Sequence, residues 1–348
     1  MTSSPSLFHF CSFAILVIAC LTFAACETPL DMDMERTASL TVVSAMPQAD
    51  TALCVRLTKS RYFLSRDGIE PITGAQVSLS LNGAPCTPTV DTSGYYHFSD
   101  VPQGGDTIAL RISTAGQEPI QASTRIPTTP VVQLISIESE YDPSKDTVTR
   151  YDDDGYTTIS PQDYDVDIRF RIADPKEENY YKVTVGYTAC HNQTIYYPQP
   201  KRDTIICQNE PLANIKCSDP AIRTLPSVID MIDEEDGSFF GQTLFFTDQT
   251  FAGKNHEMKV SLSIEYYEFQ GHDPREIPLV LSVYSLTRDQ FLYERTVAAN
   301  VSSITSLFSE PVQLHFNIKQ DGCVGILGGS ACTRIEASYY DINGTDNP

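Results

Sequence analysis

The chain has 348 residues, and its 24 Lys and Arg against 45 Asp and Glu give a formal net charge of −21. A surface this acidic repels the phosphates of nucleic acids and of anionic lipids. We therefore expect no nucleic-acid partner. The length allows two all-β domains with hydrophobic cores of their own. Beyond the first 25 residues no stretch of about 18 consecutive apolar residues occurs, so no second membrane segment is predicted.

Residues 1–25 are predicted to be a lipoprotein signal peptide. An uncharged apolar run from Phe8 to Ala25 leads into Leu-Thr-Phe-Ala-Ala-Cys at 21–26, which is a lipobox. In a lipobox, small residues precede a cysteine, here Cys26, whose thiol takes a diacylglycerol before cleavage. The first ten residues contain His9 but no Lys or Arg, so a cytosolic protein with a buried N-terminal helix is the alternative. The lipobox predicts a protein that is anchored to a membrane by a lipid at its N-terminus.

Residues 26–37 are predicted to be a solvated acidic tether. Glu27, Asp31, Asp33 and Glu35 fall within it, and it has no strand alternation. An acidic stretch just after the lipidated cysteine resembles the export signal of some Gram-negative surface lipoproteins.

Residues 38–126 are predicted to form an N-terminal β-sandwich. Apolar and polar residues alternate over 40–43, 53–57, 77–81 and 108–112, and turn signals such as Asn82-Gly83 and Ser93-Gly94 separate them. Residues 73–77 paired with 92–98 resemble the transthyretin or carboxypeptidase-regulatory type, with an immunoglobulin-like sandwich as the related possibility. In that type each glycine marks a tight backbone and each aromatic anchors the core.

Residues 126–130, with two prolines, are predicted to be the linker to a larger C-terminal β domain over 131–340. Strands are predicted over 166–172, 258–266 and, in the same manner, 278–286. One short helix begins at Thr287, whose sequence Thr-Arg-Asp-Gln is a capping box, and Phe291, Leu292 and Val297 are expected to cover the sheet. Alternation from Val312 to 318 predicts a further strand, and 322–329 a glycine-rich turn. The predicted fold class is all-β, with two sandwich-like domains.

Seven cysteines remain once the signal peptide and the lipidated Cys26 are set aside, an odd number. In an oxidising compartment most of them are expected to pair and one thiol to be left over. The candidate pairs are Cys323 with Cys332, Cys54 with Cys86, and two among Cys190, Cys207 and Cys217.

Six stretches together resemble one family, the bacterial outer-membrane lipoproteins with domain of unknown function 4249. The resemblance spans nearly all of the mature chain, although each motif alone is weak. It implies a surface or periplasmic lipoprotein of a family whose genes often lie near those of TonB-dependent receptors, which suggests an accessory role, and it offers no catalytic or ligand residue to transfer. The chain departs from the family's usual ending at 322–329, where Cys323 and Cys332 add a possible bridge. The matching stretches are 40–43, 57–63, 72–77, 245–254, 283–293 and 309–312 leading to Asn317-Ile318.

Neither metal sites nor catalytic motifs emerge from the sequence. The acidic loops at 152–155 and 233–237 lack calcium-loop spacing, and Cys190-His191 with Cys207 and Cys217 lacks zinc spacing. The hydrolase signatures His-Glu-x-x-His and Gly-x-Ser-x-Gly are missing, and no pair of carboxylates stands out. We therefore expect no cofactor and no enzymatic activity. The four histidines judged to be structural are His97, His256, His272 and His315.

Four tyrosine pairs would put one ring on each face of a strand, one in the core and one facing outward. Protein contact is the favoured use of the outward rings, since the chain has no Trp for sugar stacking. Tyr197 and Tyr267 are the residues predicted to bind a partner. The pairs are Tyr180-Tyr181, Tyr196-Tyr197, Tyr266-Tyr267 and Tyr339-Tyr340.

The sequence thus predicts a lipid-anchored outer-membrane binding protein, an accessory subunit beside a TonB-dependent nutrient transporter. An adhesin-like or structural surface lipoprotein is the main alternative. A hydrolase would need a clustered acid, base and pocket. The ligand and the oligomeric state do not follow from the sequence.

Overall fold

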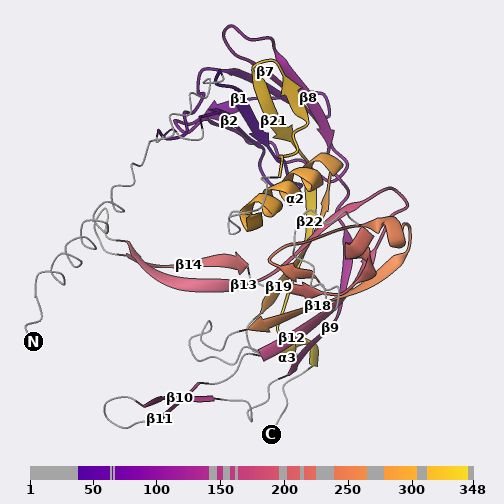
Figure 1. Ribbon diagram of the computed structural model, residues 1–348. Helices are drawn as coiled ribbons and strands as arrows, with labels where there is room; N and C mark the ends of the chain where they lie inside the picture. Colours follow the sequence, from indigo (N-terminus) through magenta and orange to yellow (C-terminus); the bar gives the residue numbers. More distant parts are fainter. Residues whose placement is uncertain are drawn as a thin grey trace, which may run out of the picture. The chain divides into compact units, whose positions relative to one another are not determined.

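The computed structural model describes residues 38–62, 65, 67–140, 147–151, 157–160, 164–195, 202–211, 215–224, 239–264, 278–303 and 312–343. In these residues the chain is all-β, with strands in several sheets and one longer helix (Figure 1). None of the helices in them is long and apolar enough to span a membrane.

Two sheets make up the N-terminal sandwich, one of six strands in the order β20-β21-β1-β2-β6-β5 and one of four in the order β4-β3-β7-β8. Apolar side chains from both enclose one buried cluster, which includes Leu57, Ile108 and Ile112. Its strands are β1 (Thr41–Ala45), β2 (Cys54–Lys59), β3 (Gln76–Leu81), β4 (Ala84–Cys86), β5 (Pro88–Val90), β6 (Tyr95–Phe98), β7 (Thr107–Ser113), β8 (Ile120–Arg125), β20 (Ile318–Gln320) and β21 (Cys323–Leu327).

The N-terminal sandwich is completed by strands from the far end of the chain. β1 pairs with β2 in antiparallel fashion and, on its other edge, runs parallel to β21 from Thr41 opposite Cys323 to Ala45 opposite Leu327. The predicted boundaries instead assigned 318–327 to the second domain. They differ because a parallel pairing joins strands that are remote in sequence, and local alternation does not reveal it.

The segments 73–77 and 92–98 lie on opposite sheets, which differs from the predicted pairing. The first segment leads into β3, which begins at Gln76 in the four-stranded sheet, and β6 belongs to the six-stranded sheet. A side chain links them instead, because the Tyr96 hydroxyl donates to the Ile72 carbonyl (3.0 Å) and accepts from the Ala75 amide. Gly94 has φ +79°, and a Cβ there would meet the Leu57 carbonyl oxygen, so the tight turn before the aromatic strand is confirmed.

The C-terminal sandwich also has two sheets, ordered β16-β15-β18-β12-β9 and β14-β13-β19-β22, with β17 pairing to β13. A separate hairpin pairs β10 with β11. The strands are β9 (Val131–Glu140), β10 (Thr147–Tyr151), β11 (Thr157–Ser160), β12 (Tyr164–Ala173), β13 (Tyr180–Ile195), β14 (Arg202–Pro211), β15 (Ile215–Cys217), β16 (Phe239–Gly241), β17 (Leu244–Thr247), β18 (Asn255–Ile264), β19 (Leu279–Leu286) and β22 (Ser330–Ala337).

Alternation predicts β12 and β18 correctly. Ile168 and Phe170 of β12 and Val260 of β18 lie in a second buried cluster, and ten residue pairs join the two strands. β19 does not alternate as expected, since it is buried on both faces along most of its length. The linker prolines lie between the end of β8 and the start of β9, where no strand is formed.

The helix α2 (Arg288–Ser303) begins one residue after the predicted start. The short helices are η2 (Pro220–Thr224), η3 (Asp248–Thr250) and α3 (Tyr339–Asn343). α3 corrects the strand context expected for Tyr339 and Tyr340, which begin this helix. Its first turn is capped by Ser338 and Asp341, whose side chains hydrogen-bond each other and each other's backbone amides.

Candidate binding groove beside helix α2

Helix α2 forms where the sequence supplies a cap and sixteen residues without Gly or Pro. Thr287 Oγ1 accepts from the Gln290 amide (3.4 Å), which confirms one half of the capping box. The other half is not made, because the Gln290 side chain donates to Glu294 instead. Phe291 is buried as predicted, with its ring against Tyr180.

The face of α2 that bears Asp289, Thr296 and Asn300 holds an extended segment, residues 312–317, which we call the strap. Spacings of seven and four residues place these side chains on one side of a helix. Asn300 Nδ2 donates to the Val312 carbonyl (2.6 Å), and its Oδ1 accepts from the Val312 amide (3.0 Å). An amide side chain therefore replaces the backbone partner that a neighbouring strand would provide.

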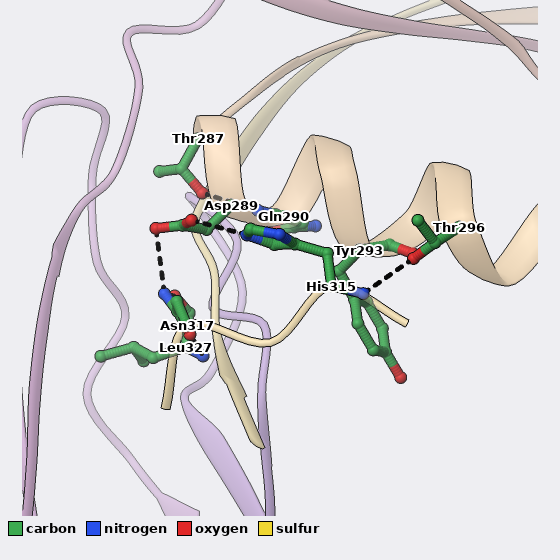
Figure 2. Close-up of polar contacts among 8 residues, drawn as sticks. All are labelled: Thr287, Asp289, Gln290, Tyr293, Thr296, His315, Asn317 and Leu327. Atoms are coloured by element: carbon green, nitrogen blue, oxygen red, sulfur yellow. Dashed lines mark hydrogen bonds and ion pairs between the residues drawn. The ribbon is translucent and has the colours of Figure 1, made fainter. Parts of the chain in front are cut away.

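The strap is fastened at two further points (Figure 2). The His315 amide donates to Thr296 Oγ1 (3.1 Å), and its ring Nε2 lies 2.9 Å from Asp289 Oδ1. Asn317 donates to Asp289 Oδ2 (3.1 Å) and makes a two-way bond to the backbone of Leu327, at 2.8 and 2.9 Å. The strap is thus tied both to the helix and to the end of β21.

The predicted strand from Val312 to 318 is therefore mostly not a strand. Only β20, from Ile318, joins a ladder, and the residues before it are extended without one. The reason is that the backbone groups of 312 and 315 bond to side chains of α2 rather than to another strand. Alternation of side chains persists because the backbone is still extended.

The glycines at 328 and 329 allow β21, β22 and the start of α2 to meet closely. The Thr287 amide donates to the Gly329 carbonyl (2.8 Å). A Cβ on Gly328 would lie 2.5 Å from Gln290 Oε1, and that oxygen has no hydrogen-bond partner in the described part of the chain. The predicted glycine-rich turn over 322–329 is thus corrected: Gly322 forms a turn and β21 is a buried strand.

A groove of about 660 Å³ opens beside the strap and the β20–β21 hairpin. Leu314 and Phe316 point to it, and the Phe316 ring packs near Tyr293 of α2 (5.9 Å between centroids). Apolar side chains with one cation and one carboxylate suit a segment of a partner that has apolar surface and a few polar groups. The lining residues are Gln313, Leu314, Phe316, Lys319, Gln320, Asp321, Cys323 and Val324.

One thiol, that of Cys323, lines this groove. Burial raises the pKa of Cys323 to about 11, so the thiol is protonated at neutral pH. Asp289 and His315 are both occupied in holding the strap.

A second hollow of about 430 Å³ lies on the four-stranded sheet of the N-terminal sandwich. Small side chains, among them Ser80, Ala109 and Ser123, leave space on the outer face. Arg111 borders it, and no described residue bonds to its guanidinium. This hollow uses none of the bonded side chains of α2, so we regard it as the weaker candidate.

A buried pair of acids fastens two loops of the C-terminal sandwich. Asp174 accepts from the Tyr181 hydroxyl (2.6 Å) and the Gly253 amide (2.7 Å), and Asp248 accepts from Asn179, backbone (3.0 Å) and side chain (3.2 Å). Burial raises the pKa of Asp248, helped by the Asp174 charge and opposed by Asn179. Sequence reasoning missed this pair, although polar residues just after buried strands were a usable signal.

Three histidines expected to be structural each lie against a carboxylate. His97 is 3.2 Å from Asp91, and His256 is 3.1 Å from Asp219 while stacking on Phe251. His315 pairs with Asp289 as above. His272 lies outside the described residues. Within the described part of the chain, no three His, Cys, Asp or Glu residues cluster as metal ligands.

The structure does not bring the predicted disulfide partners Cys54 and Cys86 together, nor Cys323 and Cys332. All four are free thiols, and within each pair the two cysteines lie on different sheets. Cys217 is also a free, buried thiol, with its pKa raised to about 11 by burial. The remaining candidates, Cys190 and Cys207, stand opposite each other in the β13–β14 ladder.

Several predicted residues lie outside the described residues: Cys26, Tyr197, Tyr267, and the acidic stretches 152–155 and 233–237. Of the tyrosine pairs, Tyr180-Tyr181 matches the expectation of one core ring. Tyr181 is buried and bonds Asp174, whereas Tyr180 is half-buried and packs on Phe291 of α2.

Comparison with known proteins gives the family. A search of curated proteins finds no match. The family model for a domain of unknown function, DUF4249, matches residues 27–336, which include the strap, helix α2 and both sandwiches. The chain therefore belongs to the DUF4249 family.

Proposed function

We propose that the protein is a lipid-anchored binding protein of the outer membrane, working as an accessory subunit beside a TonB-dependent nutrient transporter. The observation that supports this most is the lipobox at 21–26. The family match begins at residue 27, directly after Cys26, which is where the mature part of a lipoprotein would begin.

The groove beside α2 is the proposed binding site. Its two sides are the strap, which is bonded to Asp289, Asn300 and Leu327, and the β20–β21 hairpin, whose β21 pairs with β1. A groove held rigid before binding loses less conformational entropy when a partner segment enters it. Leu314 and Phe316 offer apolar contact, with Lys319 and Asp321 for orientation.

The charge of the chain favours a protein partner over a nucleic acid or the lipid surface itself. A net charge of −21 repels phosphates, whereas loops of a receptor can present basic or apolar side chains. A position beyond the inner membrane would also place the cysteines in an oxidising space, where disulfides form.

The proposal is tested by photo-crosslinking in living cells. A photoreactive residue at Gln313, in the groove, is expected to form an adduct with a β-barrel receptor, identified by mass spectrometry. The same residue at Ser123, in the hollow of the other sandwich, is the matched control and should give no such adduct. Groove adducts with no barrel receptor, or only when a second cell population is present, would contradict the accessory role, and the latter would favour an adhesin.

A further inference from the structure

Half of β13 extends beyond β19 and pairs with β14 alone among the described strands, as a two-stranded ribbon at the end of the sheet. Residues 180–187 of β13 pair with β19, whereas 186–195 pair with β14. Among the described strands, residues 188–195 have β14 as their only neighbour, and Figure 1 shows this ribbon extending away from β19. A two-stranded ribbon by itself is marginally stable in water, so a cross-link between its two strands would stabilise it.

The register of the ribbon places two cysteines opposite each other. Ten consecutive pairs join the strands without a shift, from Gly186 opposite Pro211 to Ile195 opposite Arg202, and Cys190 stands opposite Cys207. Directly opposed residues of an antiparallel pair have Cα atoms about 4.5 or about 5.5 Å apart and share one face of the ribbon. Both separations fall within the Cα range of disulfides, about 4.4 to 6.8 Å.

None of the other cysteines that the structure describes has such a partner. Cys54, Cys86, Cys217, Cys323 and Cys332 are free thiols. Cys217, the third member of the predicted group, is on β15 in the other sheet of the C-terminal sandwich, within its buried core. Among the described cysteines, Cys190 and Cys207 are therefore the one pair that could form a disulfide.

We propose that Cys190 and Cys207 form a disulfide that staples the β13–β14 ribbon. The thiolate of one cysteine attacks a disulfide oxidant, such as glutathione disulfide, and releases one reduced thiol. The second thiolate then displaces the other thiol from the mixed disulfide. The two cysteines lose two protons and two electrons, and the oxidant is reduced to two thiols. In the cell this rests on the proposed location in an oxidising compartment.

Tryptic peptide mapping tests this pairing directly, because cleavage separates the three cysteines. Lys182, Lys201, Arg202 and Lys216 bound the peptides 183–201, with Cys190, and 203–216, with Cys207; Cys217 falls in 217–223. The full chain is reduced, equilibrated with glutathione disulfide, alkylated and digested. The expected product is 183–201 linked to 203–216, which dithiothreitol separates with a gain of two hydrogens.

Two variants serve as controls. Cys217→Ser should leave the linked peptide unchanged, and Cys207→Ser should abolish it. Free thiols at both positions in glutathione disulfide, or a link from either peptide to 217–223, would overturn the proposal. Protein taken from cells is mapped in parallel. If the pair forms with glutathione disulfide but is reduced in protein taken from cells, the proposed disulfide stands and the proposed oxidising compartment is contradicted.

Discussion

The strap and β21 are neighbouring, extended segments near the end of the chain, yet they are held in different ways. β21 lies between β1 and β20 and is bonded through its backbone on both edges. The strap is bonded through side chains of α2, with Asn300 and Thr296 in place of a partner strand. The comparison shows that alternating apolar residues predict an extended backbone, but not what pairs with it.

The largest effect is expected from a substitution in β21, the segment that is bonded through its backbone. In Gly325→Ala the new Cβ would collide with the Val43 carbonyl oxygen and amide of the adjacent strand. Neither strand can shift without breaking the ladder, so we expect a loss of about 3 kcal/mol in the free energy of unfolding. Urea unfolding followed by circular dichroism measures it. Gly74→Ala is the control, since a Cβ there meets nothing within 4 Å, and equal losses in both variants would contradict the account.

The next largest effect is expected in the strap, which is held by side chains of α2. Asn300→Ala leaves the amide and carbonyl of Val312 without their partner, which should cost about 2 kcal/mol. Thr296→Val removes the hydroxyl that accepts from the His315 amide and donates to the Tyr293 carbonyl, and should cost about 1 kcal/mol. The same urea titration ranks the two variants. A strap that needs no side-chain support would leave Asn300→Ala as stable as the wild type.

A smaller effect is expected at the partly exposed end of the strap. Asp289→Ala removes the acceptor of His315 and Asn317, and solvent screening limits the loss to about 1 kcal/mol. Hydrogen exchange locates the loss. The His315 and Leu327 amides should exchange faster, while amides of β1 such as Val43 keep their protection. Uniform acceleration across both segments would mean that the strap is not a separate unit.

The comparison is sharpened by Asp248, a titratable residue whose side chain holds a loop of the C-terminal sandwich through hydrogen bonds. Because the pKa of Asp248 is raised by burial, its contribution to stability is present below the ordinary pKa of 3.8 and is lost as pH rises through the raised value. Asp248→Asn should therefore gain on the wild type as the pH is raised from 3.8 upward, with Asn179 still donating to the amide oxygen. The measurement is urea unfolding across that range.

Asp167 is the control, because its pKa is shifted in the opposite direction. Burial raises its pKa, but hydrogen bonds from Lys259 and Ser261 outweigh burial and leave it lowered. Asp167→Asn should therefore lose ground against the wild type as pH rises from the acid end. Parallel pH profiles for the two variants would show that the opposite shifts have no effect on stability.

The sequence predicted those parts of the fold that depend on local pattern. Alternation found β12 and β18, the Thr287 cap found α2, and Gly94 with Tyr96 marked a tight turn and a core ring. These features depend on residues close to one another in the chain, so their signal is in the sequence.

What the sequence could not predict depends on remote partners. β21 resembles a glycine-rich turn because Gly325 must be small where β1 approaches, and β1 is distant in sequence. The strap resembles a strand because nothing in its own residues reveals that Asn300 takes the place of a partner strand. The groove could not be predicted either, since it follows from both of these placements.

The proposal that the protein works at the outer membrane depends on the lipid at Cys26. Metabolic labelling with an alkyne analogue of palmitate tests this most directly, with Cys26→Ser as the matched control. The account predicts that the wild-type chain is labelled, shortened by its first 25 residues and recovered with outer membrane, and that the variant is unlabelled. An unlabelled, full-length wild-type chain in the cytosol would contradict it.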